Sequence, residues 1–371
     1  MLLFNWVILD SKFWFLAQKQ TINVDIEYLQ EMRGGSEIVT GNVKEAFMAG
    51  VGNFEYQNFP GSFPAGERVT LSTLASHTHI SASKLTGVST VDFHITAKCS
   101  QACPYCWGPR RFRNPVDTET AQHIIARIAE SGVRRIVFTG GDPLQRADAL
   151  SLIQYAKESG LETALSTTGD LITPEILKGL SPFLELISLP LDGSNEGISS
   201  KTKRSGHFTA ILRSLEWLRA YPGIDVKVCT PVTRYNLHDI PAIARLVEDY
   251  SHTTQARVFY NIFQAFPRAM FTVNWEKLVV ESEEFKSLAS QIGTPQNIRI
   301  NFLDHDILDR LYVMVFPDGS MIIPSGADYL NYGAFLGVDD FDHALNTSRF
   351  DSAKHLRHSH GWKKSSRIEH R

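Results

Sequence analysis

Short apolar runs alternate with longer helix-period segments between about residue 91 and residue 265 of the 371-residue chain. Runs rich in β-branched and aromatic side chains are typical of strands, whereas apolar positions three and four residues apart are typical of amphipathic helices. Asp117 or Thr118 can cap the first helix-like segment, and Gly132 follows its end. The pattern predicts six strands, at 91–97, 134–140, 162–167, 184–190, 225–232 and 256–263.

The regular alternation predicts parallel strands joined by right-handed crossovers that carry helices. Six strand–helix units are fewer than the eight of a complete barrel. We therefore expect an α/β fold, a partial (βα)6 barrel with N-terminal and C-terminal extensions, although periodicity does not separate it from a flat doubly wound sheet. In both folds the chemistry is expected in loops that follow the carboxyl ends of the strands.

Four segments are expected along the chain. Residues 1–88 are an N-terminal extension of unknown role, 89–268 are the barrel core, 269–345 are a C-terminal extension, and 346–371 are a flexible basic tail. Within the C-terminal extension, "NWEKLVVESEEFKSLASQI" predicts a helix, and "YVMVFPDGSMIIP" predicts a β-hairpin that turns at Pro-Asp-Gly.

Composition narrows the classes of partner. A net charge of −3 argues against a nucleic-acid partner held by bulk electrostatics. The apolar N-terminus is interrupted at Asp10 and Lys12, which makes it too short for a membrane span of about 20 residues. We expect it to form a strand or helix that packs on the main body. Sparse, clustered cysteine suits a reducing compartment, so a cytoplasmic protein is expected.

Three of the four cysteines, Cys99, Cys103 and Cys106, lie in the loop after the first predicted barrel strand. A structural zinc site normally takes four protein ligands, and the fourth cysteine, Cys229, lies in a strand pattern where we interpret it as a buried small hydrophobe. Three thiolates suit an iron–sulfur cubane with one iron open to an external ligand. An unrelated zinc site or a chance cluster is the alternative.

The spacing CxxxCxxC, with aromatic Tyr105 before the last cysteine, resembles the signature of the radical S-adenosylmethionine (radical SAM) enzymes. Three further motifs strengthen the resemblance over about residues 90–265: "TGGDP" (139–143), "STTG" (166–169) and "ISLPLDG" (187–193), the last followed by Arg204. A more modest likeness to viperin-like and nucleoside- or sugar-modifying members comes from "YNIFQAFPRA", which includes Gln264 and Arg268.

The resemblance implies that Cys99, Cys103 and Cys106 ligate a [4Fe–4S] cluster, whose open iron takes S-adenosyl-L-methionine. Reduction would then release a 5′-deoxyadenosyl radical that abstracts a substrate hydrogen, with electrons from an external donor such as flavodoxin or ferredoxin. The resemblance also implies a set of cofactor-binding residues: Tyr105, Gly140, Gly141, Asp142, Pro143, Thr167, Ser188, Asp192 and Arg204.

Several of these residues are expected to have distinct roles. Tyr105 would pack near the adenine, and Gly140 with Gly141 would allow close backbone approach to the cofactor. Asp142 or a nearby carbonyl would receive the ammonium group, and Arg204 would bind the carboxylate. No catalytic residue beyond this set is assigned.

The substrate is expected to be a small sugar- or nucleotide-bearing metabolite. Trp107 with Arg110, Arg111 and Arg113 beside the cysteine loop would suit an anionic substrate, although a solvated cluster of loop charges fits equally well. One alternative is a peptide-maturing or glycyl-radical-activating radical SAM enzyme. The second is a non-catalytic iron–sulfur or zinc-binding protein.

Overall fold

The computed structural model describes three N-terminal strands and residues 83–109, 114–267, 275–293, 295 and 297–359. The chain divides into two compact units, Met1–Ala82 and Ser83–Arg371. In the first unit, β1 (Asn5–Leu9), β2 (Lys12–Ala17) and β3 (Gln20–Asp25) form an antiparallel sheet. The apolar N-terminal run therefore contributes β1 and, beyond Asp10, β2.

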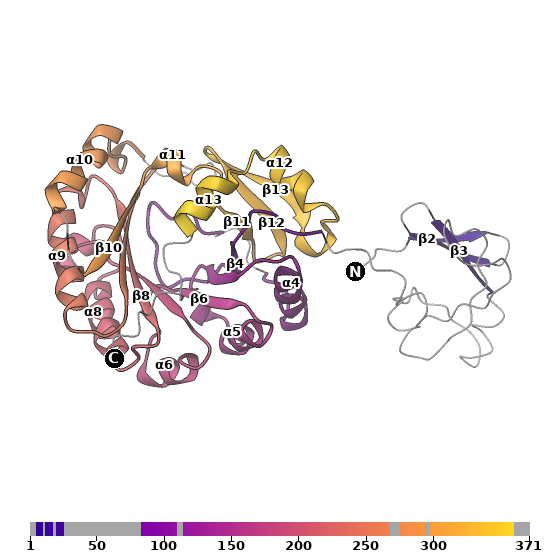
Figure 1. Ribbon diagram of the computed structural model, residues 1–371, viewed down its shortest axis with the longest axis horizontal. Coiled ribbons are helices and arrows are strands. Elements are labelled where there is room, and N and C mark those ends of the chain that lie inside the picture. Colours follow the sequence, from indigo (N-terminus) through magenta and orange to yellow (C-terminus); the bar gives the residue numbers. More distant parts are fainter. Residues whose placement is uncertain are drawn as a thin grey trace. The chain divides into compact units, whose positions relative to one another are not determined.

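A ten-stranded sheet forms the centre of the second unit, with the order β10-β9-β8-β7-β6-β5-β4-β11-β12-β13 (Figure 1). The strands from β4 to β9 are parallel neighbours. Each begins and ends within two residues of its predicted bounds. They are β4 (Thr90–Thr96), β5 (Arg135–Gly140), β6 (Glu162–Ser166), β7 (Leu186–Pro190), β8 (Asp225–Val232) and β9 (Val258–Gln264).

The crossover helices follow the expected order and cover the outer face of the sheet (Figure 1). They are α4 (Thr118–Glu130), α5 (Ala149–Glu158), α6 (Pro174–Leu180), α7 (Glu196–Ser199), α8 (His207–Leu218) and α9 (Ile240–Ser251). Asp117 caps α4 by accepting a hydrogen bond of 2.7 Å from the backbone N–H of Thr120. Gly132 has φ +85°, a conformation that glycine adopts without strain at the end of a helix.

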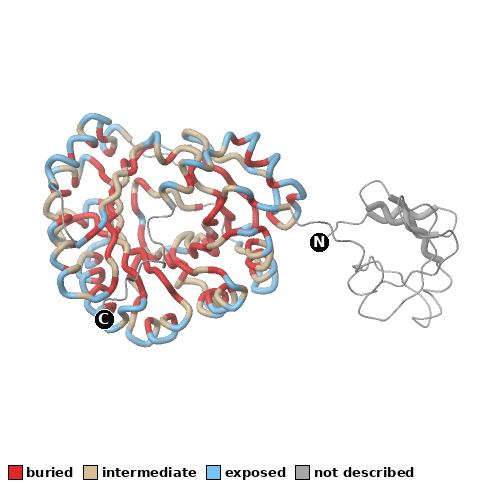
Figure 2. Tube along the Cα trace, viewed as in Figure 1, coloured by how far each residue is buried: buried red, intermediate tan, exposed pale blue. Residues whose placement is uncertain are grey.

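Alternate residues of the strands pack against these helices. In β4, Val91, Phe93 and Ile95 are fully buried in one cluster with α4 residues such as Ile124. Figure 2 shows the buried positions along the strands and the helix surfaces that face them, with exposed positions on the outer helix surfaces. The even-numbered residues of β4 therefore point to the opposite, inner face of the sheet, because successive strand residues alternate in direction.

The C-terminal segment extends the sheet at both ends. β10 (Ile298–Leu303), which is not among the predicted strands, is a further parallel strand beside β9, and β11 (Val313–Val315) pairs parallel to β4. β11 and β12 (Ser320–Ser325) form the predicted hairpin, and β13 (Asp328–Ala334) completes the sheet. Because β10 and β13 are the two edges, the barrel is open, which confirms the partial-barrel prediction.

The predicted helix from Asn274 to Ile292 is only partly correct. A 3-10 turn, η3 (Trp275–Lys277), and α10 (Ser282–Ile292) are separate elements. Glu281 is extended and begins α10 with a capping box whose partner is Glu284. The capping box starts a new helix at this point, so the continuous helix that periodicity suggested is divided in two.

The prediction of a flexible tail from residue 346 is wrong up to Ser359. Helix α12 (Phe341–Thr347) continues into this segment, and α13 (Ser352–Ser359) follows it. His355 of α13 is only 2% exposed; its Nε2 accepts a hydrogen bond of 3.0 Å from the N–H of Ser89, and its Nδ1 bonds the carbonyl of Leu311 at 2.8 Å. This buried imidazole attaches the polar segment to the start of β4. Residues 360–371 lie outside the described residues.

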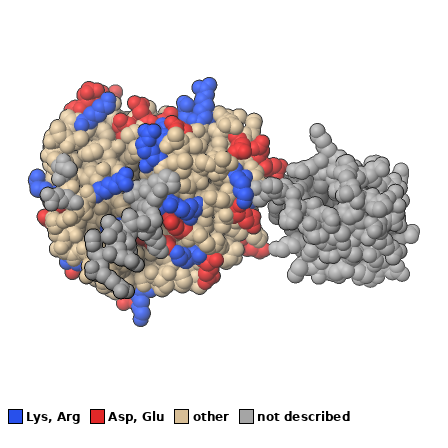
Figure 3. Space-filling view, in the orientation of Figure 1, with Lys and Arg blue, Asp and Glu red and all other residues tan. Residues whose placement is uncertain are grey.

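The surface carries both signs of charge. On the face shown in Figure 3, basic and acidic side chains are interspersed over the described part of the second unit. Within the described ranges, no helix has both the length and the apolar character needed to cross a membrane.

Candidate active site

The cysteine loop lies directly after β4, as predicted, at the carboxyl end of the parallel strands. Cys103 is buried, Cys106 is half-buried and Cys99 is exposed. Backbone N–H groups already point at two of the sulfurs: Gln101 donates to Cys99 Sγ at 3.4 Å, and Gly108 donates to Cys106 Sγ at 3.2 Å. Amide donors of this kind stabilise sulfur that carries negative charge.

The three thiols are close enough to influence one another electrostatically. Burial raises the pKa of Cys99 to about 11, and the charges of Asp142, Cys103 and Cys106 add to that rise. Burial likewise raises the pKa of Cys103, and the nearby Lys203 ammonium opposes the rise. Thiolate at this loop therefore needs a positive partner, such as iron, to persist at neutral pH.

The donor set of this loop fits an iron–sulfur cluster, in which each of three thiolates would bind a separate iron. Soft sulfur donors on one loop, with amide N–H groups aimed at them, suit iron–sulfur chemistry.

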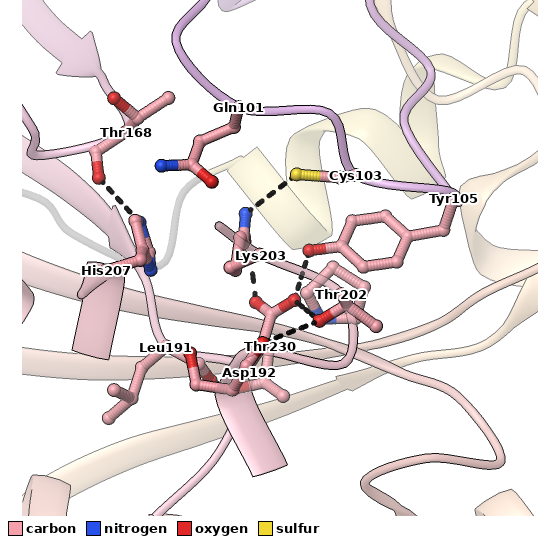
Figure 4. Close-up of polar contacts among 12 residues, drawn as sticks. Gln101, Cys103, Tyr105, Thr168, Leu191, Asp192, Thr202, Lys203, His207 and Thr230 are labelled. Carbon is pink, nitrogen blue, oxygen red and sulfur yellow. Dashed lines mark hydrogen bonds and ion pairs between the residues drawn. The ribbon is translucent and has the colours of Figure 1, made fainter. Parts of the chain in front are cut away.

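Lys203 links the cysteine loop to the end of β7 (Figure 4). Its Nζ lies 3.2 Å from Cys103 Sγ and 3.9 Å from Asp192 Oδ1. Asp192 also accepts hydrogen bonds from the hydroxyls of Tyr105 and Thr202, the latter at 2.6 Å. Burial alone lowers the pKa of Lys203, but the charges of Asp192 and Cys103 outweigh it and raise that pKa. The lysine is therefore a buried cation next to a predicted cluster ligand.

Asp142 joins the ends of β5 and β6. Its carboxylate is fully buried and accepts hydrogen bonds from the hydroxyls of Thr167 at 2.7 Å and Thr168 at 2.6 Å, and from the N–H of Leu144 at 3.2 Å. Burial raises its pKa, and these hydrogen bonds oppose the rise. Because its oxygens already have protein donors, the side chain of Asp142 positions the loops, and a backbone carbonyl is the better candidate for the ammonium group. Pro143 begins the short 3-10 turn η1 (Pro143–Gln145).

The glycines before Asp142 let β5 meet the start of the cysteine loop. The N–H of Gly141 donates to the carbonyl of Thr96, and the N–H of Asp142 donates to that of Lys98, both at 2.7 Å. A Cβ on Gly140 would lie 2.2 Å from Thr96 O. The close approach found here is thus between two protein segments, and close approach to a cofactor stays a prediction.

A second set of contacts holds the other side of the loop. Gln101 donates to Asp170 at 2.6 Å and accepts from the backbone N–H of Arg204 at 2.8 Å. His207 Nε2 bonds the carbonyl of Thr168 at 2.9 Å (Figure 4). These bonds join the cysteine loop to the segments after β6 and β7.

Sequence reasoning selected Arg204 and missed Lys203. The side chain of Arg204 is exposed, whereas that of Lys203 is 5% exposed and contacts Cys103. The stretch "SKTKRSGH" holds several adjacent basic residues, and its irregular backbone gives no period from which to read which one points inward. That Arg204 binds the carboxylate of the cofactor stays a prediction, and Lys203 is a second candidate for this contact.

The interpretation of Cys229 as a core residue is wrong. Val226 and Val228 are fully buried against the helices, so Cys229, one residue further, points to the inner face and is half-buried. Its Sγ lies 3.2 Å from the hydroxyl of Ser188, another predicted site residue. Alternation along β8 was read correctly, but the face that Cys229 shares is that of Lys227 and not that of the valines.

The arginines predicted to lie beside the cysteine loop fall outside the described residues. Arg110, Arg111, Arg113 and Arg268 are all among the undescribed positions. Trp107 packs edge-on against Phe266 at a centroid distance of 4.8 Å. Gln264 is buried and bonds the carbonyl of Val280 at 3.0 Å, which indicates a structural contact.

Deeper on the inner face, β4 carries two polar side chains, those of Asp92 and His94. His94 is 8% exposed, and neither ring nitrogen has a hydrogen-bond partner among the described residues. Burial lowers its pKa to about 3, so the ring is neutral. Burial raises the pKa of Asp92 to about 6, and the Lys227 ammonium of β8 partly opposes that rise.

Asp92→Asn is expected to stabilise the protein near pH 7. Because folding raises the pKa of Asp92 from 3.8 to about 6, native stability falls as pH increases through that window. Asparagine cannot ionise, so the free energy of unfolding of D92N should exceed that of the native protein by about 1–2 kcal/mol at neutral pH. This is less than the full pKa shift would give, because Asp92 keeps some contact with solvent. Urea unfolding at several pH values measures this difference, which should vanish below about pH 4. D328N, at an exposed position of β13, is the control; a pH-independent difference for D92N would contradict the expectation.

Comparison with known proteins agrees with this geometry. A family model described as the Radical SAM superfamily matches residues 93–247, from within β4 into α9. The solved structure of native anSMEcpe with bound AdoMet has a TM-score of 0.54 at 14% identity, over 73% of this chain and 82% of that one. Residues 93–247 thus form a radical SAM domain, and the cysteine loop lies at the carboxyl ends of its parallel strands.

Curated relatives differ in how much they share. The Fe-coproporphyrin III synthase of Methanosarcina barkeri is 33% identical over 163 residues, which are 43% of this chain and 41% of that protein. The S-adenosylmethionine-dependent nucleotide dehydratase of Selenomonas ruminantium is 25% identical over 280 residues, which are 71% of this chain and 96% of that protein. The chain spans between 41% and 50% of the length of the first four relatives. Other relatives matched over a similar length carry the names of a peptide cyclase and maturases.

Proposed function

We propose that this protein cleaves S-adenosyl-L-methionine reductively at a [4Fe–4S] cluster and abstracts hydrogen from a small sugar- or nucleotide-bearing metabolite. The observation that carries the proposal is the cysteine loop after β4. There, backbone N–H groups donate hydrogen bonds to the sulfurs of Cys99 and Cys106, and the ammonium of Lys203 donates one to the sulfur of Cys103. A cytoplasmic enzyme that takes electrons from an external flavodoxin or ferredoxin is the corresponding cellular setting.

When bound, the cluster and S-adenosyl-L-methionine supply the 5′-deoxyadenosyl radical, and the protein supplies binding, orientation and shelter from water. Cys99, Cys103 and Cys106 hold the cluster. The buried Lys203 cation is available to an anionic carboxylate, together with the predicted contact at Arg204. Tyr105 presents its ring beside Cys103 while its hydroxyl is held by Asp192.

Of the remaining predicted cofactor residues, Thr167 and Asp142 brace the loops from β5 and β6. Gly140 and Gly141 keep the backbone of this segment close to the cysteine loop. Ser188 offers an inner-face hydroxyl at the end of β7. Their role is to keep the reacting centre in one geometry, which is the protein's main contribution to radical chemistry.

The small-molecule substrate is supported by the extent of similarity. The nucleotide dehydratase aligns over 280 residues and 96% of its own length, whereas the relatives named as peptide cyclase and maturase align over 162 and 165 residues and 42% of theirs. Because these shorter matches are nonetheless 29% to 31% identical, a peptide-maturing enzyme is the second candidate.

Anaerobic reconstitution tests the proposal. The protein is loaded with iron and sulfide, reduced with dithionite and given S-adenosyl-L-methionine, and 5′-deoxyadenosine is measured by liquid chromatography. Release of 5′-deoxyadenosine is the expected result. An intact cluster without this product would exclude the proposed activity, and a colourless zinc-loaded protein would favour a non-catalytic metal protein.

A further inference from the structure

Three inner-face side chains are left unused by the cysteine-loop site: Asp92 and His94 on β4, and Lys227 on β8. Asp92 and Lys227 are half-buried, and the charge of Lys227 acts on Asp92. Both ring nitrogens of His94 are buried, and neither has a hydrogen-bond partner among the described residues. A buried, unpaired imidazole carries a cost that a bound polar molecule would remove.

The surroundings of the three side chains define a polar site with apolar walls. Asp92 lies in register with Val137, and Val137 joins Ala164, Leu186 and Phe259 in a small apolar cluster on the same inner face. On the other side, β11, the turn after it and β12 supply the apolar cluster of Met314, Phe316 and Ile322. Phe316 meets the His94 ring edge-on at 5.2 Å between centroids. The polar groups are therefore concentrated on β4 and β8.

The two charged groups share this space from opposite sides of the open barrel. Lys227 lies in β8, four strands away from β4 in the sheet and in register with Ser188 of β7, yet its charge acts on Asp92. Burial disfavours the carboxylate form of Asp92. Asp225, two residues before Lys227 on the same face of β8, is bonded to Arg257. Lys227 is therefore available to an anion, while Asp92 and neutral His94 can each exchange hydrogen bonds with hydroxyl groups.

We propose that Asp92, His94 and Lys227 form the substrate-recognition site, and that the substrate is a hydroxylated small molecule bearing an oxyanion, carboxylate or phosphate. Lys227 binds the oxyanion, and Asp92 with His94 binds the hydroxyls. This inference rests on the proposed function and narrows its substrate class. The position below the cysteine loop, on the inner face of the same strands, places the hydroxylated carbons on the side of the barrel where the radical would form.

Two probes separate the sources of the oxyanion: ribose 5-phosphate and gluconate, with ribose and inorganic phosphate as their fragments. Binding to the reconstituted holoenzyme with S-adenosyl-L-methionine is measured anaerobically by calorimetry. We expect at least one of the two probes to bind more tightly than its fragments. K227M should weaken that binding about tenfold or more, because it removes a charged hydrogen bond, and H94F should weaken it about fivefold.

K178M, at an exposed position of α6, is the matched control and should bind as the native protein does. Failure of both probes to bind, or K227M binding as tightly as native protein, overturns the inference. Iron content and 5′-deoxyadenosine release are measured in the same preparations. Normal release without probe binding refutes only this inference, whereas a loaded cluster without release refutes the proposed function itself.

Discussion

Cys103→Ala is expected to abolish iron loading while leaving the chain folded and in solution. Cys103 is the most buried of the three loop cysteines, and its sulfur is the one that faces Lys203 and the end of β7. With two thiolates left, a cubane would lose an iron ligand that no neighbouring side chain on the loop replaces. Iron and sulfide analysis after anaerobic reconstitution, together with visible absorption, measures the loss.

Cys229→Ala is the matched control for this experiment. It removes the same thiol, but from the inner face of β8 beside Ser188. Iron content should stay at the native level in C229A. Native iron content in C103A would refute the ligand assignment, and a loss of iron in both variants with intact circular dichroism would mean that Cys229 also contributes a ligand.

Gly141→Ala is expected to lower the free energy of unfolding by about 3 kcal/mol, at the upper end of overpacking effects. A Cβ at this position would lie 2.1 Å from the carbonyl oxygen of Lys98 and 2.7 Å from that of Ala97. Both contacts are with backbone, which cannot rotate away as a side chain could. Relief would require the cysteine loop to move next to Cys99, so iron loading should fall as well.

Gly223→Ala provides the comparison, since a Cβ there meets nothing within 4 Å and the position has no left-handed backbone. Urea unfolding of the two variants should show a large loss for G141A and a change within about 0.5 kcal/mol for G223A. Equal stabilities would show that the loop relaxes easily around the new methyl group, which would contradict a rigid junction between β5 and the cysteine loop.

The barrel strands could be predicted closely because their signal is local. Each is a short run of buried apolar residues bounded by polar ones, and the inward and outward alternation follows from strand geometry. β10 was not among the predicted strands, although its sequence "IRINFL" begins with alternating apolar and polar residues, a pattern typical of a half-buried strand. It lies beyond the regular strand–helix alternation from which the other strands were predicted, and its pairing with β9 makes it a sheet edge.

The polar C-terminal segment was predicted wrongly because its structure depends on distant residues. Its composition indicates a solvated tail, and no local pattern in it predicts a contact with the core. One histidine, His355, finds backbone partners at Ser89 and Leu311, both distant in the chain, and so attaches α13 to the barrel. Such long-range hydrogen bonds are set by the packed fold and leave no trace in local sequence.

By itself, the sequence determined the class of chemistry and its place on the chain, because ligand identity and spacing are local properties: Cys99, Cys103 and Cys106 lie on one loop at the end of a parallel strand. Only the tertiary structure decided which neighbours face that loop. It turned Lys203 inward and Arg204 outward, and it placed Asp92, His94 and Lys227 on one inner surface. The reason is physical: these groups come from separate strands and irregular loops, whose relative rotation is set by packing against the rest of the barrel.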